Sequence, residues 1–395
     1  MKIKKDNTIC IFSICAIILI AYFLINFITE RLFVDNPYNS YMLQARSWLE
    51  GRLHLGKNYP HLELAIYEGK YFVSFPPFPS YVMLPFAALG IYGGDSYIVL
   101  LFSLLSGIYA YKTICCFEKP PTTALFWSAF ITIGSNWLFN ATVPWVWFIA
   151  QNMAFALSLM SIYYAIRKKA ALSFAFWACA VGCRPFQAVY IFVLLYILFS
   201  EYKKDGLSVK EMITKNLHAL IAPCAIAASY MVLNYMRFGN ILEFGHNYLP
   251  EFTRVSTGQF NISYLSENIK CLFRFPITMD KDKLLWIKFN GFCIFIASPV
   301  FISYIVYMIR GLIKGKADRK LIILIAITAI IHLFVITLHK TMGGAHYGNR
   351  YTNDLLPFIL LSIALTIKDK PSIVDVVLFL VGTALNIHWS ILFFG

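Results

Sequence analysis

The chain has 395 residues and a formal net charge of +14, yet only 14% of its residues are charged and 59% are hydrophobic. Soluble domains carry about 25% charged residues, so this composition excludes a soluble protein and indicates a polytopic membrane protein. The positive charge does not indicate nucleic-acid binding. Most lysines and arginines lie in short segments between apolar stretches, where membrane proteins concentrate them.

Apolar segments recur along the whole chain, and about eleven of them are candidates for membrane-spanning helices. Several are shorter than the ~20 residues that a perpendicular helix needs, so we expect tilted, kinked or broken helices. The predicted fold class is an all-α polytopic membrane protein that forms a single domain over residues 1–395. The predicted spans are 9–28, 97–115, 123–139, 147–166, 170–183, 187–199, 217–236, 291–309, 321–338, 355–367 and 374–394.

The basic residues also predict the orientation. Lys2, Lys4 and Lys5 precede the first apolar run, which is longer than a usual signal core, so we interpret this run as a retained anchor with a cytoplasmic N-terminus. The outside then receives two long loops, 29–96 and 237–290, and a short loop, 339–354. The expected location is the plasma or inner membrane, with several spans and an extracytoplasmic active site.

The first external loop contains signals of local structure. Apolar residues recur at helical spacing between Tyr38 and Leu49, with Asn39, Gln44, Arg46 and Glu50 on the other face. Asn36 is the predicted N-cap of this interfacial helix, Pro37 its first residue and Gly51 its end.

Two short strands follow in the same loop. Residues 62–67 and 70–73 flank Glu68-Gly69, which predicts a two-residue hairpin turn. The prolines at 76, 77 and 79 predict extended backbone before an apolar segment, 80–89, returns to the membrane surface.

Asp35 stands just before the predicted interfacial helix. A carboxylate kept at the membrane surface is a candidate general base or metal ligand, and the positive helix end would favour its ionised form. The alternative interpretation is that Asp35 and Asn36 only cap the helix.

The external loop carries a pattern that resembles a known superfamily. It runs through Asp35, Tyr38, Leu43-Gln44, Leu49-Glu50-Gly51-Arg52-Leu53, Tyr71-Phe72 and Phe75-Pro76-Pro77-Phe78-Pro79, followed by an apolar segment. This layout resembles the GT-C glycosyltransferases, which include the protein O-mannosyltransferases and the lipid A aminoarabinose transferase. The resemblance implies eleven or more spans and a catalytic acid at Asp35, with Glu30 and Glu63 as further candidates. The chain departs from the pattern at Asn36, where a second acid is frequent, and at Ser74-Phe75, where a charged residue is frequent.

A glycine-rich segment precedes the span 355–367. Backbone N–H groups at a helix start bind anions, and Arg350 could hold a phosphate through two hydrogen bonds. The resemblance implies that Arg350 and Tyr351 lie near the lipid phosphate, whereas the alternative is a membrane-interface anchor. Arg184 must find a partner if it is buried, although no acid is near it in sequence, and we expect it to face the same phosphate.

Two histidines in external loops, His246 and His346, are further candidates for substrate binding. They could bind a metal together with Asp35, but no ligand spacing supports this. We therefore assign no metal ligand and no certain cofactor, and leave a divalent metal open.

The resemblance implies a hexosyl- or pentosyltransferase that moves a sugar from a polyprenyl-phosphate donor to an extracytoplasmic hydroxyl of a lipid, glycan or protein, with inversion and with Asp35 as base. No soluble stretch is long enough for a Rossmann domain, so a nucleotide sugar is not the expected donor. Two alternatives stay open. A flippase or transporter of lipid-linked glycans would place charges along a midplane path. A glycan polymerase or ligase would concentrate arginines in one late loop, and 237–290 is long enough for this. The expected partners are the lipid-linked donor, the acceptor and the bilayer, without nucleic acid.

Overall fold

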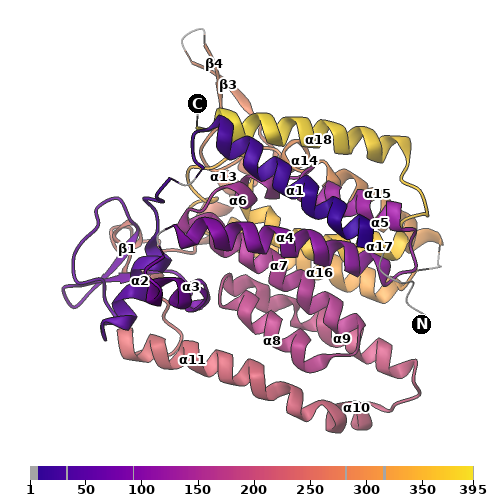
Figure 1. Ribbon diagram of the computed structural model, residues 1–395, viewed down its shortest axis with the longest axis horizontal. Coiled ribbons are helices and arrows are strands. Elements are labelled where there is room, and N and C mark those ends of the chain that lie inside the picture. The colour runs from indigo at the N-terminus through magenta and orange to yellow at the C-terminus, as the bar shows by residue number, and fades with distance from the viewer. Residues whose placement is uncertain (1–7, 33, 92, 281–282, 315–316, 395) are drawn as a thin grey trace.

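The computed structural model describes residues 8–32, 34–91, 93–280, 283–314 and 317–394, and most of it is helical (Figure 1). The long helices lie roughly side by side, and the hairpin β1–β2 with α2 and α3 lies at one end of the bundle (Figure 1). The long helices are α1 Thr8–Ile28, α4 Gly94–Cys115, α5 Pro121–Thr132, α7 Val146–Ile166, α8 Ala170–Val181, α9 Ile191–Lys203, α11 Ile221–Phe238, α15 Val300–Lys314, α16 Arg319–Thr337, α17 Leu356–Thr366 and α18 Ile373–Leu392.

Shorter elements connect these helices. They are α2 Ser40–Leu49, α3 Phe78–Ala88, α6 Trp137–Thr142, α10 Val209–Asn216, α12 Pro250–Thr253, α13 Leu265–Phe273, α14 Ile294–Ala297, the 3₁₀ turns η1 Pro185–Tyr190, η2 Leu217–Leu220, η3 His246–Tyr248, η4 Ile262–Tyr264 and η5 Arg350–Leu355, and the strands β1 Leu64–Tyr67, β2 Lys70–Val73, β3 Ile277–Asp280 and β4 Lys283–Trp286.

The predicted fold class is confirmed, and each of the predicted apolar segments overlaps one of the long helices. Within the described residues, seven helical stretches are long and apolar enough to cross a membrane, and three apolar helices are shorter. The predicted span 291–309 was wrong at its start, because α15 begins only at Val300. Asn290 and Gly291 both have positive φ, and Pro299 then precedes the new helix, so the chain turns before it becomes helical.

Helix α7 is the centre of the bundle. Of its most apolar stretch, 89% is buried, compared with 33% for α1 at the periphery. It packs against α4, α8, α9 and α17. The start of α7 therefore lies in the middle of the loop-bearing end, where it can contact several loops at once.

Polar side chains join neighbouring helices inside the bundle. Asn152 of α7 donates to the Val99 carbonyl at 2.9 Å and to the Ser103 hydroxyl at 3.0 Å, both in α4. Asp375 of α18 accepts bonds of 2.7 Å from the hydroxyls of Ser303 and Tyr307 in α15. Such bonds hold helices together where apolar surroundings provide no competing water.

The first loop folds largely as predicted, but its helix starts later. Helix α2 begins at Ser40, not at Pro37, and Asn39 takes the N-cap position. The Asn36 amide donates to the Pro144 carbonyl at 2.6 Å, 108 residues away, and its Oδ1 accepts from the Tyr38 backbone N–H at 2.9 Å, in a turn that precedes the helix. The predicted stop at Gly51 is confirmed, with φ of 74°.

Gln44 does not lie on a polar face as predicted. It is buried and accepts a 2.7 Å bond from the Ser80 hydroxyl of α3. The predicted hairpin is confirmed: Tyr67 pairs with Lys70, and both Glu68 and Gly69 have positive φ, as the favoured two-residue turn requires.

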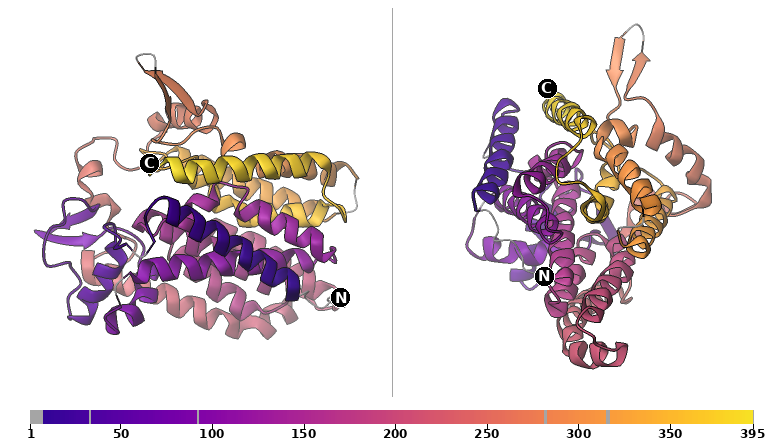
Figure 2. Two further views of the ribbon diagram at one scale, coloured as in Figure 1. Left: turned by 45° about the horizontal axis from the view of Figure 1, so that its top comes forward. Right: turned by 90° about the vertical axis from the view of Figure 1, so that its right-hand side faces the viewer.

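The second long loop carries its own elements, from η3 to the hairpin β3–β4. This hairpin extends away from the helices in both views of Figure 2, whereas the loop segments before and after it return to the bundle. The second loop thereby adds a wall at the end that already carries α2, α3 and β1–β2.

Candidate functional site

A cavity of about 540 Å³ opens at the loop-bearing end of the bundle. Its walls come from the first loop, the start of α7, the α8–η1 turn, the second loop and the segment 339–351. The polar residues of these walls include Glu63, Arg184, Glu243, His246, Glu251, His339, Arg350 and Tyr351, and the aromatic ones include Tyr38, Phe75, Trp145 and Trp147.

Arg350 lies in the cavity wall and is 5% exposed. Its Nε and Nη2 donate to the Gly343 carbonyl at 3.1 and 3.0 Å, and its Nη1 donates to the Trp147 carbonyl at 3.1 Å. Gly343 has φ of 109°, and a Cβ there would lie 2.7 Å from Arg350 Nε, so a glycine is needed at this position. Both acceptors are neutral carbonyls, and among the described residues Arg350 forms no ion pair. Its positive charge is therefore uncompensated, and burial lowers its pKa.

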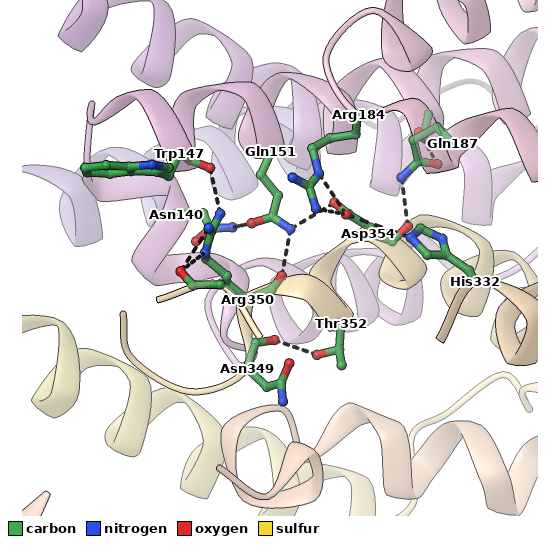
Figure 3. A network of polar contacts seen from close by, with 12 residues as sticks. Asn140, Trp147, Gln151, Arg184, Gln187, His332, Asn349, Arg350, Thr352 and Asp354 are labelled. Atoms are coloured by element: carbon green, nitrogen blue, oxygen red, sulfur yellow. Dashed lines mark hydrogen bonds and ion pairs between the residues drawn. The ribbon is translucent and has the colours of Figure 1, made fainter. Parts of the chain in front are cut away.

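Arg184 finds the partner that the sequence analysis could not name. Its Nε donates to Oδ2 of Asp354 at 2.9 Å, and its Nη2 forms an ion pair with the same oxygen at 2.9 Å, across 170 residues of sequence (Figure 3). Asp354 is 1% exposed. The Tyr351 ring lies close to both arginines, with its centroid 5.0 Å from Cζ of Arg184 and 4.7 Å from Cζ of Arg350.

Two glutamines complete this network (Figure 3). Gln151 of α7 donates to Oδ1 of Asp354 at 2.9 Å and to the Arg350 carbonyl at 2.7 Å, and its own carbonyl accepts from Asn140 at 2.9 Å. Gln187 donates to the Asp354 carbonyl at 3.0 Å. The turn η5, which carries Arg350 and Asp354, is thereby fixed to α7 and η1.

Of the three predicted acids, Glu63 alone lines the cavity. Its Oε2 accepts a 2.9 Å bond from the Trp147 indole. The carboxyl is accessible from the cavity but closely surrounded by protein, and this burial raises its pKa above 4.5. Trp147 therefore binds Arg350 with its carbonyl and Glu63 with its ring.

The structure does not bring Asp35 and Glu30 to the cavity. Both side chains are exposed, and neither lines the cavity wall. Asp35 nevertheless lies three residues before Tyr38, which does line it. The role of Asp35 as base stays a prediction.

The two predicted histidines lie in different places. His246 lines the cavity with its ring 5.5 Å from that of Phe75, and burial lowers its pKa to about 4, so it is neutral at neutral pH. His346 is fully buried outside the cavity lining. His339, which the sequence analysis did not select, lines the cavity, and burial lowers its pKa to about 4 as well.

Metal ligands do not gather around these residues. In the described part of the chain, no group of three or more histidine, cysteine, aspartate or glutamate side chains is placed to hold a metal ion. Asp354, Gln151 and Glu251 are the site residues that sequence reasoning missed. Their only signal was polarity within or beside apolar segments.

The fold is that of a mostly helical, polytopic membrane protein. The chain is similar to the crystal structure of ArnT from Cupriavidus metallidurans bound to undecaprenyl phosphate, with a TM-score of 0.54 and 14% sequence identity. The match covers 96% of this chain and 63% of the ArnT chain, so this chain spans less than two thirds of that protein. No protein-family model matches the chain, and no curated protein matches it.

The Arg184–Asp354 pair makes a prediction about stability. Arg184→Met leaves a buried carboxylate without its cation, which costs about 3–5 kcal/mol of unfolding free energy. Adding Asp354→Asn removes that charge and should recover most of the loss. Unfolding of purified protein in mixed micelles measures both variants.

The exposed pair Lys168–Asp205 provides a control, because its side chains are 36% and 47% exposed. Lys168→Met should cost less than about 1 kcal/mol. Equal stabilities for Arg184→Met with and without Asp354→Asn would contradict the assignment of Asp354 as a buried charge that depends on Arg184.

Proposed function

We propose that this protein is a membrane glycosyltransferase that transfers a sugar from a polyprenyl-phosphate donor to an extracytoplasmic hydroxyl group. One observation supports this most directly: an uncompensated guanidinium and a carboxylate face one cavity at the end of a bundle of apolar helices. The similar fold of ArnT, solved with undecaprenyl phosphate, supports the choice of donor.

The arginines account for the leaving group. When the bond between the sugar and the phosphate breaks, negative charge grows on the phosphate oxygen. A guanidinium that is already fixed by protein carbonyls stabilises this charge without rearranging, so it lowers the barrier more than it strengthens ground-state binding. Arg350 has this arrangement, and Arg184 and Tyr351 lie beside it.

The acceptor hydroxyl needs a base, and we assign this role to Glu63. A base works best when its pKa approaches the working pH, and burial moves the pKa of Glu63 in that direction. In this scheme Glu63 takes the hydroxyl proton as the acceptor oxygen attacks the sugar carbon, and the phosphate leaves from the opposite side, which inverts that carbon. Asp35 and Glu30 are the alternative bases from the sequence analysis.

Replacing Glu63 tests the assignment. Glu63→Gln keeps the shape and can still accept from Trp147, but it cannot take a proton, so transfer should fall by roughly 10²–10⁴. Asp35→Asn and Glu30→Gln are the matched controls, and both should retain most activity. Transfer from a prenyl-phosphate sugar, normalised to folded protein, is the measurement. Loss in Asp35→Asn with full activity in Glu63→Gln would assign the base to Asp35.

The pH profile adds a second readout on the same residue. The base form of Glu63 is lost as pH falls through its raised pKa, so the rate should decline on the acid side. Trp147→Phe removes the hydrogen bond that lowers this pKa, so the acid limb should move to higher pH. If the acid limb of the pH profile is unchanged in Trp147→Phe, the group that titrates there is not Glu63.

Arg350 gives a further prediction. Arg350→Lys keeps the charge but cannot donate to both Gly343 and Trp147 in a planar fork, so it should be impaired. Arg350→Ala should lose on the order of 3 kcal/mol of transition-state stabilisation, as deletion of one oxyanion donor does. A residue that served only as an interface anchor would tolerate lysine in transfer assays, and alanine would then reduce yield more than turnover.

We also propose that the cavity opens outside the cytoplasm. The basic residues of the short loops support this orientation. The exposed positions Ser256, in the second long loop, and Lys203, at the end of α9, can each be replaced by cysteine in a Cys224→Ser background, since Cys224 is exposed. An impermeant thiol reagent should label intact cells at 256, and at 203 only after permeabilisation. The reverse pattern would invert the topology.

A further inference from the structure

We propose that Asp354 is a positioning residue that sets the charge of the anion site. It holds Arg184 at the cavity wall and leaves the two-arginine site with one net positive charge, which suits one phosphodiester in preference to a diphosphate. This inference rests on the proposed function, because it concerns the phosphate of the same donor.

The geometry places Asp354 behind Arg184, away from the cavity. Asp354 is 1% exposed and does not line the cavity, whereas Arg184 does. Arg184 contacts Asp354 through the Nε and Nη2 edge of its guanidinium: Nε bonds to Oδ2, and Nη2 forms an ion pair with the same oxygen. Neither contact uses Nη1, so the second edge of the guanidinium remains available to a phosphate.

Asp354 is itself held from two sides. Gln151 donates to its Oδ1, and Gln187 donates to its backbone carbonyl. The same Gln151 amide donates to the carbonyl of Arg350. One glutamine therefore fixes the anion that orients Arg184 and also the backbone that carries Arg350, so the two arginines have a defined relative position (Figure 3).

The net charge of this cluster determines which phosphate group it binds more tightly. Two guanidinium groups and one carboxylate leave a single positive charge in this cluster. The other carboxyl groups that line the cavity, Glu63, Glu243 and Glu251, can add only negative charge, which disfavours a second anionic group further. A phosphodiester carries one negative charge and is neutralised, whereas a diphosphate brings at least one more charge that must be desolvated without a partner.

The test measures binding of a polyprenyl-phosphate sugar, which is a phosphodiester, and of the matching polyprenyl-diphosphate sugar to the full chain in nanodiscs. The wild type should bind the monophosphate more tightly. Asp354→Asn keeps the size and an acceptor oxygen but raises the cluster charge by one, so the ratio of affinities should move at least tenfold toward the diphosphate. The double variant Arg184→Gln/Asp354→Asn returns to one positive charge, and its ratio should return toward the wild-type value.

Two further variants separate charge from fold. Asp375→Asn removes another buried carboxylate, hydrogen-bonded to Ser303 and Tyr307 between α15 and α18, and should leave the ratio unchanged. Arg350→Gln removes one cation without altering Asp354, so it should move the ratio toward the monophosphate even if Asp354→Asn fails to fold. A purely structural role for Asp354 would weaken binding of both lipids equally.

The outcomes distinguish this inference from the proposed function. If the wild type binds neither lipid, the proposed donor is wrong. If it binds the monophosphate but the ratio stays the same in Asp354→Asn and in Arg350→Gln, the proposed donor stands and the charge-setting role of Asp354 is overturned.

Discussion

The ion pair between the buried carboxylate of Asp354 and Arg184 is the interaction on which the cavity depends. Removing a carboxylate from water is costly, and the cost is offset only when a cation and further donors surround it. Here the cation comes from Arg184 at the end of α8, and the donors come from Gln151 in α7 and Gln187 in η1. Because these groups belong to separate helices, the arrangement exists only when the bundle is assembled, and it fixes the turn that carries Arg350.

Trp147 connects this network to the carboxylate side of the cavity. Its carbonyl accepts from Arg350, and its indole donates to Glu63. The residue stands at the start of α7, the most buried of the candidate membrane spans, so its position is determined by the packing of the whole bundle. Arg350 and Glu63 belong to loop segments, and Trp147 at the start of α7 holds both of them in position.

The sequence predicted the parts that depend on local patterns. Apolar length located the helices, and Glu68-Gly69 located the hairpin turn because two adjacent positive φ values are needed there. The predicted start of α2 was too early: Asn36 Oδ1 accepts from the Tyr38 N–H in a turn before the helix, and its amide donates to Pro144, a residue that lies far away in the chain. For the same reason the partner of Arg184 could not be named: Asp354 lies 170 residues away, and no local pattern encodes that contact. Glu63 was one of three acids until the fold placed it in the cavity wall.

Arg350 and Glu63 face the same cavity, but each is held by neutral groups of the protein. A guanidinium and a carboxylate that face one cavity would be expected to form a salt bridge, which a phosphate would then have to break. In this structure three of the five N–H groups of Arg350 donate to neutral carbonyls, which leaves two for a phosphate, and Glu63 is held by a neutral indole. Each charged group is thus oriented without being neutralised. Burial without a counterion is unfavourable for both, which lowers the pKa of Arg350 and raises that of Glu63. A phosphate would stabilise the charge of Arg350, and a proton would neutralise Glu63. Glycosyl transfer from a lipid phosphate releases both, because the phosphate leaves the sugar and the acceptor hydroxyl loses its proton.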